Sequence, residues 1–322
     1  MSSSPKIETL QAGRALAAFA VVIHHAGLAA SSFGQSFFGQ SILERGYLGV
    51  DFFFVLSGFI IFESTADGQK SLADYVRARF QRVYLPYWPI GLGIALLYSL
   101  FPTISTVTRD WSWLPTLFLL PVASSPALSV AWTLQHEILF YTIFGLGFFG
   151  RSLTIGLGLW GLAIIVAWIG NPNNVLALAP INLEFLMGVG IAVMRRKGWG
   201  SAGWLMLAPI PFVIWLVLNA DRNLSFLVGA SFALAMLPII KLEQDGNIRV
   251  YSWLSFWGAA SYSLYLVHGL AISIFVRLLP TTNVVVILFV AIGASLLAGG
   301  TYHLLVERPI LRFWSTKRKK IN

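Results

Sequence analysis

The chain of 322 residues contains no cysteine, and only 11% of its residues are charged. The absence of cysteine excludes disulfides, thiolate metal sites and a cysteinyl thioester intermediate. Soluble domains are about one quarter charged, whereas 57% of this chain is hydrophobic. The composition therefore predicts an all-α, polytopic integral membrane protein, in which membrane lipids surround the helices.

Ten apolar stretches are long enough to cross a bilayer, and an even number places both chain ends on the same side. They fall at about 12–30, 47–64, 84–101, 131–149, 153–170, 176–194, 203–219, 224–240, 258–278 and 284–305. We therefore expect one membrane-embedded domain over residues 1–322. A shorter apolar stretch at 111–121 is broken by prolines and predicts an interfacial or re-entrant segment. Pro209 and Pro211 predict a kink in the seventh stretch.

The distribution of basic residues predicts that both termini are cytoplasmic. With the N-terminus inside, 17 of the 22 Lys and Arg residues lie on the cytoplasmic side, four lie outside, and Arg14 lies within the first span. The four outer residues are Arg45, Arg109, Arg222 and Arg277. This asymmetry follows the positive-inside rule. Topology thus explains the net charge of +9, and no nucleic-acid partner is expected.

The first apolar stretch carries Arg14 near its cytoplasmic end and His24-His25 in its outer third. Eleven steps of about 100° return almost to the starting direction, so Arg14 and His25 share a helical face, about 16 Å apart along the axis. Because ionisable side chains are costly in hydrocarbon, this face is expected to line a protein-walled, partly wet cavity. The alternatives are a cleaved signal peptide, a snorkelling Arg14 and a packed His24.

Carboxylates in later stretches are expected at similar depths. Asp51 enters at roughly the depth of His25, where it is expected to orient the imidazole and stabilise the imidazolium. The alternative for Asp51 is a charge satisfied by the helix dipole. Glu137 and Tyr141 lie one helical turn apart, where a carboxylate needs a partner, and His136 or His25 is the candidate partner of Glu137. Glu184 is a second intramembrane carboxylate.

Three arginines in six residues, Arg77, Arg79 and Arg82, lie just inside the membrane. The positive-inside rule alone explains such a cluster. The functional interpretation is a guanidinium cluster aimed at phosphates, which arginine binds bidentately. Arg79 and Arg82 lie three residues apart on one helical face, and Arg14 is a candidate to join them.

Polar residues also mark the last two stretches. Ser261, Tyr265 and His268 fall at i, i+4 and i+7, and predict a polar stripe that faces the bundle interior. We expect His303 to be packed or interfacial. Glu307 is expected to close the last helix and to pair with a loop arginine.

Several of these segments together resemble the acyltransferase-3 family of ten-helix membrane O-acyltransferases. The matching segments are Arg14 with His25, Gly49-Val50-Asp51 followed by Phe52-Phe53-Phe54-Val55-Leu56-Ser57-Gly58-Phe59, Arg79-Phe80-Gln81-Arg82 with Pro86, Trp132-Thr133-Leu134 with Glu137-Ile138-Leu139-Phe140-Tyr141, Ser261-Tyr262-Ser263-Leu264-Tyr265-Leu266-Val267-His268, and Glu307-Arg308-Pro309. Each motif alone is weak, but six in order across essentially the whole chain make a specific match.

The resemblance implies transfer of an acyl group, usually acetyl, from cytoplasmic acyl-CoA to a hydroxyl of a carbohydrate, in the bacterial inner membrane. The family's arginine and histidine of the first helix carry over to Arg14 and His25, and its paired arginines to Arg79 and Arg82. Some members of the family have an extracytoplasmic domain after the last helix. We expect none between the last apolar stretch and Asn322, which favours the compact, exopolysaccharide-modifying type of the family. No metal cofactor is expected.

The residues and the resemblance lead to the same expected mechanism. The arginines hold the CoA phosphates, and His25 removes the proton from the acceptor hydroxyl as it attacks the thioester. Asp51 or Glu137 stabilises the resulting imidazolium, and Tyr265 or a backbone donor stabilises the oxyanion. The acceptor sugar, acetyl or succinyl as the acyl group, and a covalent acyl-His or acyl-Ser intermediate stay open.

Two other classes of protein share part of this pattern. A proton-coupled secondary transporter or flippase also has buried carboxylates and an intramembrane arginine, although many transporters consist of two related halves. Residues 1–160 and 161–322 show no repeat. A non-catalytic membrane scaffold would not need an arginine, a histidine and two carboxylates at matched depths.

Overall fold

A computed structural model describes residues 7–32, 39–67, 71–102, 110–122, 124–170, 175–279 and 283–319, with side chains up to residue 314. In these ranges the chain is helical, without a strand, so the predicted all-α class is confirmed. An isolated bridge joins Trp111 to Ser125. Four of the basic residues counted above lie outside the described residues: Lys6, Lys70, Arg109 and Lys320.

Six helical stretches of the described chain are long and apolar enough to cross a membrane, which makes this a multi-pass membrane protein. They are Glu8–Ser31, Gln40–Thr65, Leu72–Leu100, Arg222–Gln244, Ser252–Arg277 and Val284–Trp314. Each coincides with one of the ten expected spans. Shorter apolar helices, Leu153–Ile169 and Trp204–Val217, occupy two of the other four windows.

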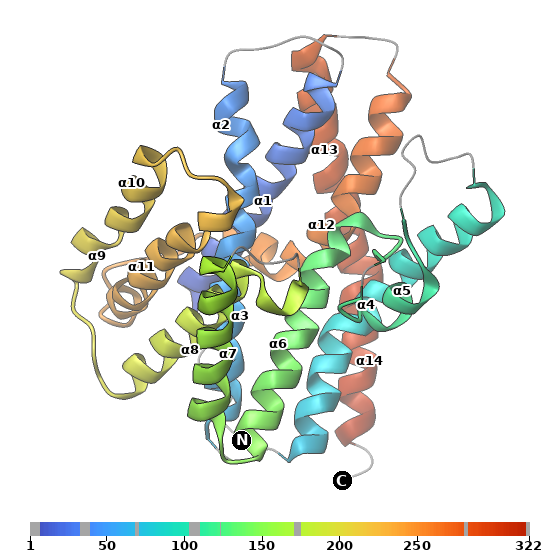
Figure 1. Ribbon diagram of the computed structural model, residues 1–322. Helices are drawn as coiled ribbons and strands as arrows, with labels where there is room; N and C mark the ends of the chain where they lie inside the picture. The colour runs from blue at the N-terminus through green and yellow to red at the C-terminus, as the bar shows by residue number, and fades with distance from the viewer. Residues whose placement is uncertain are drawn as a thin grey trace. The chain divides into compact units, whose positions relative to one another are not determined.

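The contacts divide the chain into two compact units, whose α-helices are labelled in Figure 1. Unit 1 comprises Met1–Ala66 and Leu183–Gly300, and unit 2 comprises Asp67–Asn182 and Thr301–Asn322. The helices of unit 1 are α1 (Glu8–Ser31), α2 (Gln40–Glu44), η1 (Arg45–Leu48), α3 (Gly49–Thr65), α8 (Leu183–Arg196), α9 (Trp204–Leu207), α10 (Pro209–Val217), η6 (Arg222–Leu224), α11 (Phe226–Gln244), α12 (Ser252–Arg277) and α13 (Val284–Tyr302), which runs to the unit boundary.

Helix α1 is the central helix of unit 1, with α12 packed along it and α3 beside it. Two glycines allow these close approaches. A Cβ at Gly258 of α12 would lie 2.1 Å from the carbonyl oxygen of Gln11, and one at Gly49 of α3 would lie 2.4 Å from that of Ala17. Small residues at such crossings let helix backbones meet. The opposite face of α1 carries the exposed Leu16.

A carboxylate from α11 holds the N-terminus of α1. Ile7 precedes the helix and offers no side-chain cap, so the first N–H groups need another acceptor. The carboxylate of Glu243 accepts from the backbone N–H of Glu8 at 2.7 Å and of Thr9 at 2.9 Å. This contact fixes the start of the helix that carries the arginine and histidine singled out above.

Unit 2 contains α4 (Leu72–Leu100), α5 (Trp113–Phe118), η3 (Ser129–Ala131), α6 (Trp132–Phe149), α7 (Leu153–Ile169), η4 (Leu176–Leu178), η5 (Pro180–Asn182), the π-helical turn η7 (His303–Glu307) and α14 (Arg308–Lys319). Helix α4 begins well before the expected span at 84–101. Its N-cap is Ser71, whose hydroxyl accepts from the N–H of Asp74 at 3.1 Å. The arginine-rich segment is therefore part of a long helix and not a loop.

Two further boundaries differ from or refine the sequence analysis. The expectation that Glu307 closes the last helix was wrong, because α14 continues the helical chain from Arg308. Pro309 does not stop it, because a first-turn residue needs no N–H donor. In the window 203–219 the helix is interrupted at Ala208, before Pro209, where the kink was expected.

The segment expected to be interfacial or re-entrant contains only the short helix α5. Three side chains of α4, those of Tyr84, Tyr87 and Trp88, hold this helix by its carbonyl groups. The hydroxyl of Tyr87 donates to the carbonyl of Thr116 at 2.9 Å, and the indole N–H of Trp88 donates to that of Leu117 at 3.0 Å. Its depth in a membrane stays a prediction.

Candidate active site

His25 is half-buried on α1, and its ring meets a second histidine from α12. Its Nδ1 lies 2.9 Å from the carbonyl oxygen of Val21 and 3.3 Å from Nε2 of His268. The two ring centroids are 4.7 Å apart in an edge-on arrangement. A carbonyl oxygen can only accept, so Nδ1 of His25 carries a hydrogen. In the neutral ring Nε2 then has a free lone pair, which is what a general base requires.

Arg14 lies on the same helix, half-buried, three turns before His25. The spacing of eleven residues along an unbroken α-helix keeps the two side chains on one face, about 16 Å apart. The sequence analysis is confirmed in placing both in one helix. Phosphate binding by Arg14 stays a prediction.

Asp51, on the first turn of α3, lies next to other polar groups of unit 1. It is 1% exposed, and Glu184 at the start of α8 is completely buried. The two carboxyl groups interact with each other and with Ser225. Neither oxygen of Glu184 finds a hydrogen-bond donor of good geometry among the described residues. The hydrogen bonds described for His25 go to other groups, so the orienting role of Asp51 stays a prediction.

A positive charge lies near this carboxyl pair. Arg222 interacts electrostatically with Asp51, Glu184 and His25. Its guanidinium carbon lies 5.3 Å from the ring centroid of Tyr47, a cation–π distance. The sequence alone did not reveal this contribution, because Arg222 was expected only as a charge outside the membrane. The sequence did contain a signal for this contribution. Arg222 lies directly before an apolar stretch, in a chain with two intramembrane carboxylates.

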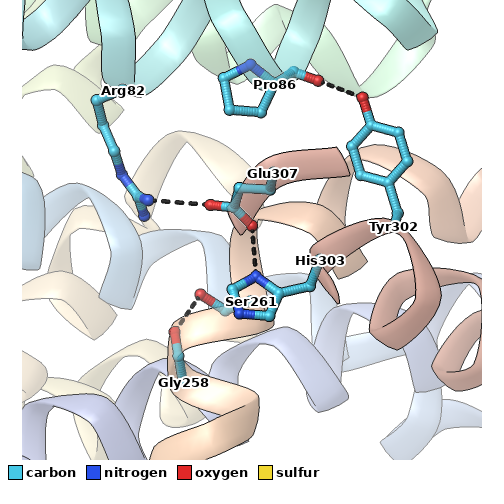
Figure 2. A network of polar contacts seen from close by, with 7 residues as sticks. All are labelled: Arg82, Pro86, Gly258, Ser261, Tyr302, His303 and Glu307. Carbon is cyan, nitrogen blue, oxygen red and sulfur yellow. Dashed lines mark hydrogen bonds and ion pairs between the residues drawn. The ribbon is translucent and has the colours of Figure 1, made fainter. Parts of the chain in front are cut away.

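Tyr265 belongs to the predicted polar stripe on α12. It is half-buried and lies one turn before His268. Its carbonyl oxygen lies 2.7 Å from Nδ1 of His268. Ser261, the first member of the stripe, is buried and donates to the carbonyl of Gly258 at 2.9 Å (Figure 2). Ser261 is thus engaged within its own helix, whereas the stabilisation of an oxyanion by Tyr265 stays a prediction.

In unit 2, Arg79 lies over aromatic rings. Its guanidinium carbon is 5.6 Å from the ring centroid of Tyr141 on α6 and 5.9 Å from that of Tyr75 on α4. The Nε atom of Arg79 is buried without a hydrogen-bond partner among the described residues. Glu137 accepts a hydrogen bond from the hydroxyl of Tyr141, a partner other than the expected His136 or His25.

Arg82 is held by a carboxylate in the same unit. Its Nη1 lies 3.1 Å from Oε1 of Glu307, which is 1% exposed. The other oxygen of Glu307 lies 2.8 Å from Nδ1 of His303 (Figure 2). Glu307 and His303 both come from the π-helical turn η7. Such turns are frequent at functional sites. The prediction that Glu307 pairs with an arginine is confirmed, while His303 is its second partner.

Two more polar contacts anchor unit 2. The hydroxyl of Tyr302 donates to the carbonyl of Pro86 at 2.7 Å (Figure 2). Pro86 lies inside α4 and Pro89 follows one turn later, so two i→i−4 hydrogen bonds are absent there. His136, buried on α6, contacts the side-chain oxygen of Asn182 through Nδ1 at 2.8 Å. This histidine therefore has a structural partner that the sequence did not suggest.

The predicted site residues fall into two groups. His25, Arg14, Asp51 and Tyr265 belong to unit 1, where His25 meets His268. The members in unit 2 are Arg79, Arg82 and Glu137.

The comparisons with known proteins give a consistent answer. The acyltransferase-3 family, described as "Acyltransferase domain", matches residues 7–303. "Exopolysaccharide production protein ExoZ" of Rhizobium meliloti (strain 1021) is 29% identical over 297 residues, which cover 85% of this chain and 92% of that protein. "Acyltransferase MdmB" of Streptomyces mycarofaciens is 24% identical over an alignment of 344 residues, and the match covers 86% of this chain and 84% of that protein. No solved structure matches.

The family match covers both units, and it includes every residue proposed above for the site. The histidine of α1, the arginines of α4 and the acid of α6 therefore all lie within the matched region. This chain belongs to the acyltransferase-3 family and is a membrane O-acyltransferase.

Proposed function

We propose that the protein transfers an acyl group, acetyl in the first instance, from cytoplasmic acyl-CoA to a hydroxyl of an exported or cell-surface carbohydrate. The similarity to a protein named for exopolysaccharide production supports a polysaccharide or lipid-linked glycan as acceptor. We further propose ten spans in a bacterial inner membrane with both termini cytoplasmic, which the distribution of Lys and Arg supports.

The observation that carries the proposal is the hydrogen bond between Nδ1 of His25 and the carbonyl of Val21. It leaves the Nε2 lone pair to accept a proton on the helix that also carries Arg14. As the acceptor hydroxyl attacks the thioester carbonyl, its proton moves to Nε2 of His25 and a C–O bond forms. The C–S bond then breaks, and the departing thiolate takes the proton from Nε2.

The other expected residues have separate roles in this proposal. Arg14, Arg79 and Arg82 bind the CoA phosphates, because guanidinium groups pair with phosphate oxygens bidentately. Tyr265 donates to the oxyanion of the tetrahedral intermediate. Asp51 and Glu137 are the carboxylate candidates to stabilise the imidazolium, and a neutral partner from α12 is the alternative argued below. No metal takes part in these steps.

The test uses purified protein in detergent with radiolabelled acetyl-CoA, and it follows CoA binding and thioester turnover separately. His25→Ala is expected to bind CoA normally and to lose turnover by a factor of about 10² to 10⁴, the usual contribution of a general base. Arg14→Ala is expected to weaken CoA binding. His24→Ala is the matched control, because it removes the neighbouring imidazole of the same helix and should keep both properties.

Either of two outcomes would contradict the proposal. Wild-type protein that neither binds nor consumes acyl-CoA would exclude this donor. Full turnover in His25→Ala would exclude His25 as the base. Proton-coupled uptake of a glycan precursor into vesicles by the same preparation would then favour a transporter.

A further inference from the structure

We propose that His268 is the positioning residue of His25, a neutral partner that fixes the orientation of the base through Nδ1. The inference rests on the proposed function only in treating His25 as the base. The contacts that support it all lie within unit 1, between α1 and α12.

The hydrogens of both rings follow from backbone carbonyls. Nδ1 of His268 lies 2.7 Å from the carbonyl oxygen of Tyr265 and 3.2 Å from that of Leu264. Because these oxygens only accept, Nδ1 of His268 carries the hydrogen, and in the neutral ring Nε2 has the lone pair. Nδ1 of His25 carries a hydrogen for the same reason, given its carbonyl partner Val21 at 2.9 Å.

The 3.3 Å contact between the rings therefore has one possible direction when both are neutral. Nδ1–H of His25 donates to Nε2 of His268, and it shares its hydrogen with the carbonyl of Val21. Three-centre bonds, in which one N–H is shared between two acceptors, also occur commonly at helix termini. If the ring of His268 had the other tautomer, two N–H groups would face each other across this contact.

The surroundings keep His268 in this state. His268 is completely buried. Its ring contacts the ring of Tyr265, at a centroid distance of 5.8 Å, and that of His25, at 4.7 Å. The ring of His24 contacts that of His25 edge-on, at a centroid distance of 4.9 Å. The hydrogen bonds of the base to Val21 and His268 both involve Nδ1, so Nε2 is the ring nitrogen left for substrate.

This arrangement assigns His268 the position that a carboxylate has in a Ser-His-Asp triad. When Nε2 of His25 takes the hydroxyl proton, its Nδ1–H becomes a charge-assisted donor to Nε2 of His268. His268 neither gains nor loses a proton during the cycle. A neutral acceptor performs this task without a fixed negative charge at membrane depth, where an unpaired charge is costly.

The decisive comparison is between His268→Asn and His268→Gln. Asparagine places an N–H where Nδ1 was, so the bond to the carbonyl of Tyr265 is kept, but no atom reaches the former position of Nε2. Glutamine places its amide oxygen near that position and can accept from His25. We expect His268→Asn to lower kcat by about 10- to 100-fold, the usual cost of removing an orienting partner, with an unchanged KM for acyl-CoA. His268→Gln should stay within about threefold of wild type.

The outcomes separate this inference from the proposed function. Equal kcat values for the two variants would overturn the positioning role, provided that wild type turns over acyl-CoA. Wild type without any turnover would contradict the proposed function instead. His268→Asn alone could instead raise the KM and lower the yield of folded protein in parallel. This result would indicate a purely structural role and would also overturn the positioning role of His268.

A second measurement does not depend on activity. Nitrogen NMR of protein labelled with ¹⁵N-histidine distinguishes protonated from unprotonated ring nitrogens, and His268→Gln and His25→Gln assign the two signals. We expect both rings to carry hydrogen on Nδ1 and none on Nε2. A hydrogen on Nε2 of His268 would overturn the inference, because that nitrogen could then not accept.

Discussion

The two units hold their chemically important side chains in different ways. In unit 1 the His25 and His268 rings are fixed by backbone carbonyls of their own helices, so each proton position follows from the helix. In unit 2 the arginines are held by other side chains, Arg79 by aromatic rings and Arg82 by a carboxylate. Backbone contacts fix a proton and leave one ring nitrogen for substrate. Side-chain contacts hold a positive charge, and a phosphate of the proposed donor would have to compete with them for it.

The two arginines of α4 differ in the same respect. Arg79 faces the rings of Tyr75 and Tyr141, which attract a cation but supply no anion. Arg82 already has an anionic partner in the buried Glu307. A phosphate therefore gains more from Arg79 than from Arg82, where it competes with a carboxylate. The comparison predicts that the two arginines contribute unequally to donor binding.

The largest effect in unit 2 is expected for Arg79→Ala. Hydrogen bonds to charged groups contribute about 1.5–3 kcal/mol, so the KM for acyl-CoA should rise by about 10- to 100-fold with little change in kcat. Arg77→Ala is the matched control on the same helix, where Arg77 is exposed, and it should change KM by less than about twofold. Steady-state kinetics over a range of acyl-CoA concentrations measures both. If both substitutions changed the KM for acyl-CoA equally, the positive-inside rule alone would explain the arginine cluster.

The sequence was sufficient to predict the fold class and much of its detail. Hydrophobic length and the shortage of charge identified the six long helices, because a bilayer requires about 20 apolar residues. Helix ends were less predictable. The start of α4 depends on a capping hydrogen bond at Ser71, and the continuation through Pro309 depends on its position in a first turn. Both are local effects that an apolar window does not register.

The candidate site could be predicted residue by residue but not partner by partner. Helical spacing placed Arg14 with His25, and Glu137 with Tyr141, because both pairs lie within one helix. The partners His268, Glu184 and Arg222 come from helices far along the chain. Similar depth in the membrane suggested Asp51 as the partner of His25, but depth does not determine which helix packs against α1. That is decided by small residues such as Gly258.

Smaller effects on acyl-CoA binding are expected for two substitutions of Glu307, and the two effects have opposite signs. Glu307→Gln keeps an oxygen that accepts from Arg82 but removes the negative charge, and neutral acceptors bind about half as strongly. A phosphate then competes better, and the dissociation constant of acyl-CoA should fall by about threefold. Glu307→Ala removes the contacts to both Arg82 and His303, so it should weaken binding through lost positioning.

Equilibrium binding of radiolabelled CoA distinguishes these outcomes. His303→Gln is a useful control, because it alters the second partner of Glu307 and leaves the ion pair with Arg82 in place. Weaker binding in Glu307→Gln, to the same extent as in Arg82→Ala, would show that the carboxylate acts only by positioning. The contrast between Arg79, held by aromatic rings, and Arg82, held by a carboxylate, would then no longer apply.

The smallest effect is expected for Asp51→Asn, and it concerns the partner of the base. Asp51 interacts with the buried carboxyl group of Glu184, and two adjacent carboxyl groups away from water are favoured when they share a proton. Asparagine is a neutral isostere that can donate to Glu184 in place of that proton. We therefore expect kcat to change by about two- to threefold, far less than for His268→Asn. If Asp51 were the group that stabilises the imidazolium, the neutral substitution would lower kcat by orders of magnitude. Parallel kcat measurements on the two variants thus decide whether His25 relies on a neutral ring or on a carboxylate.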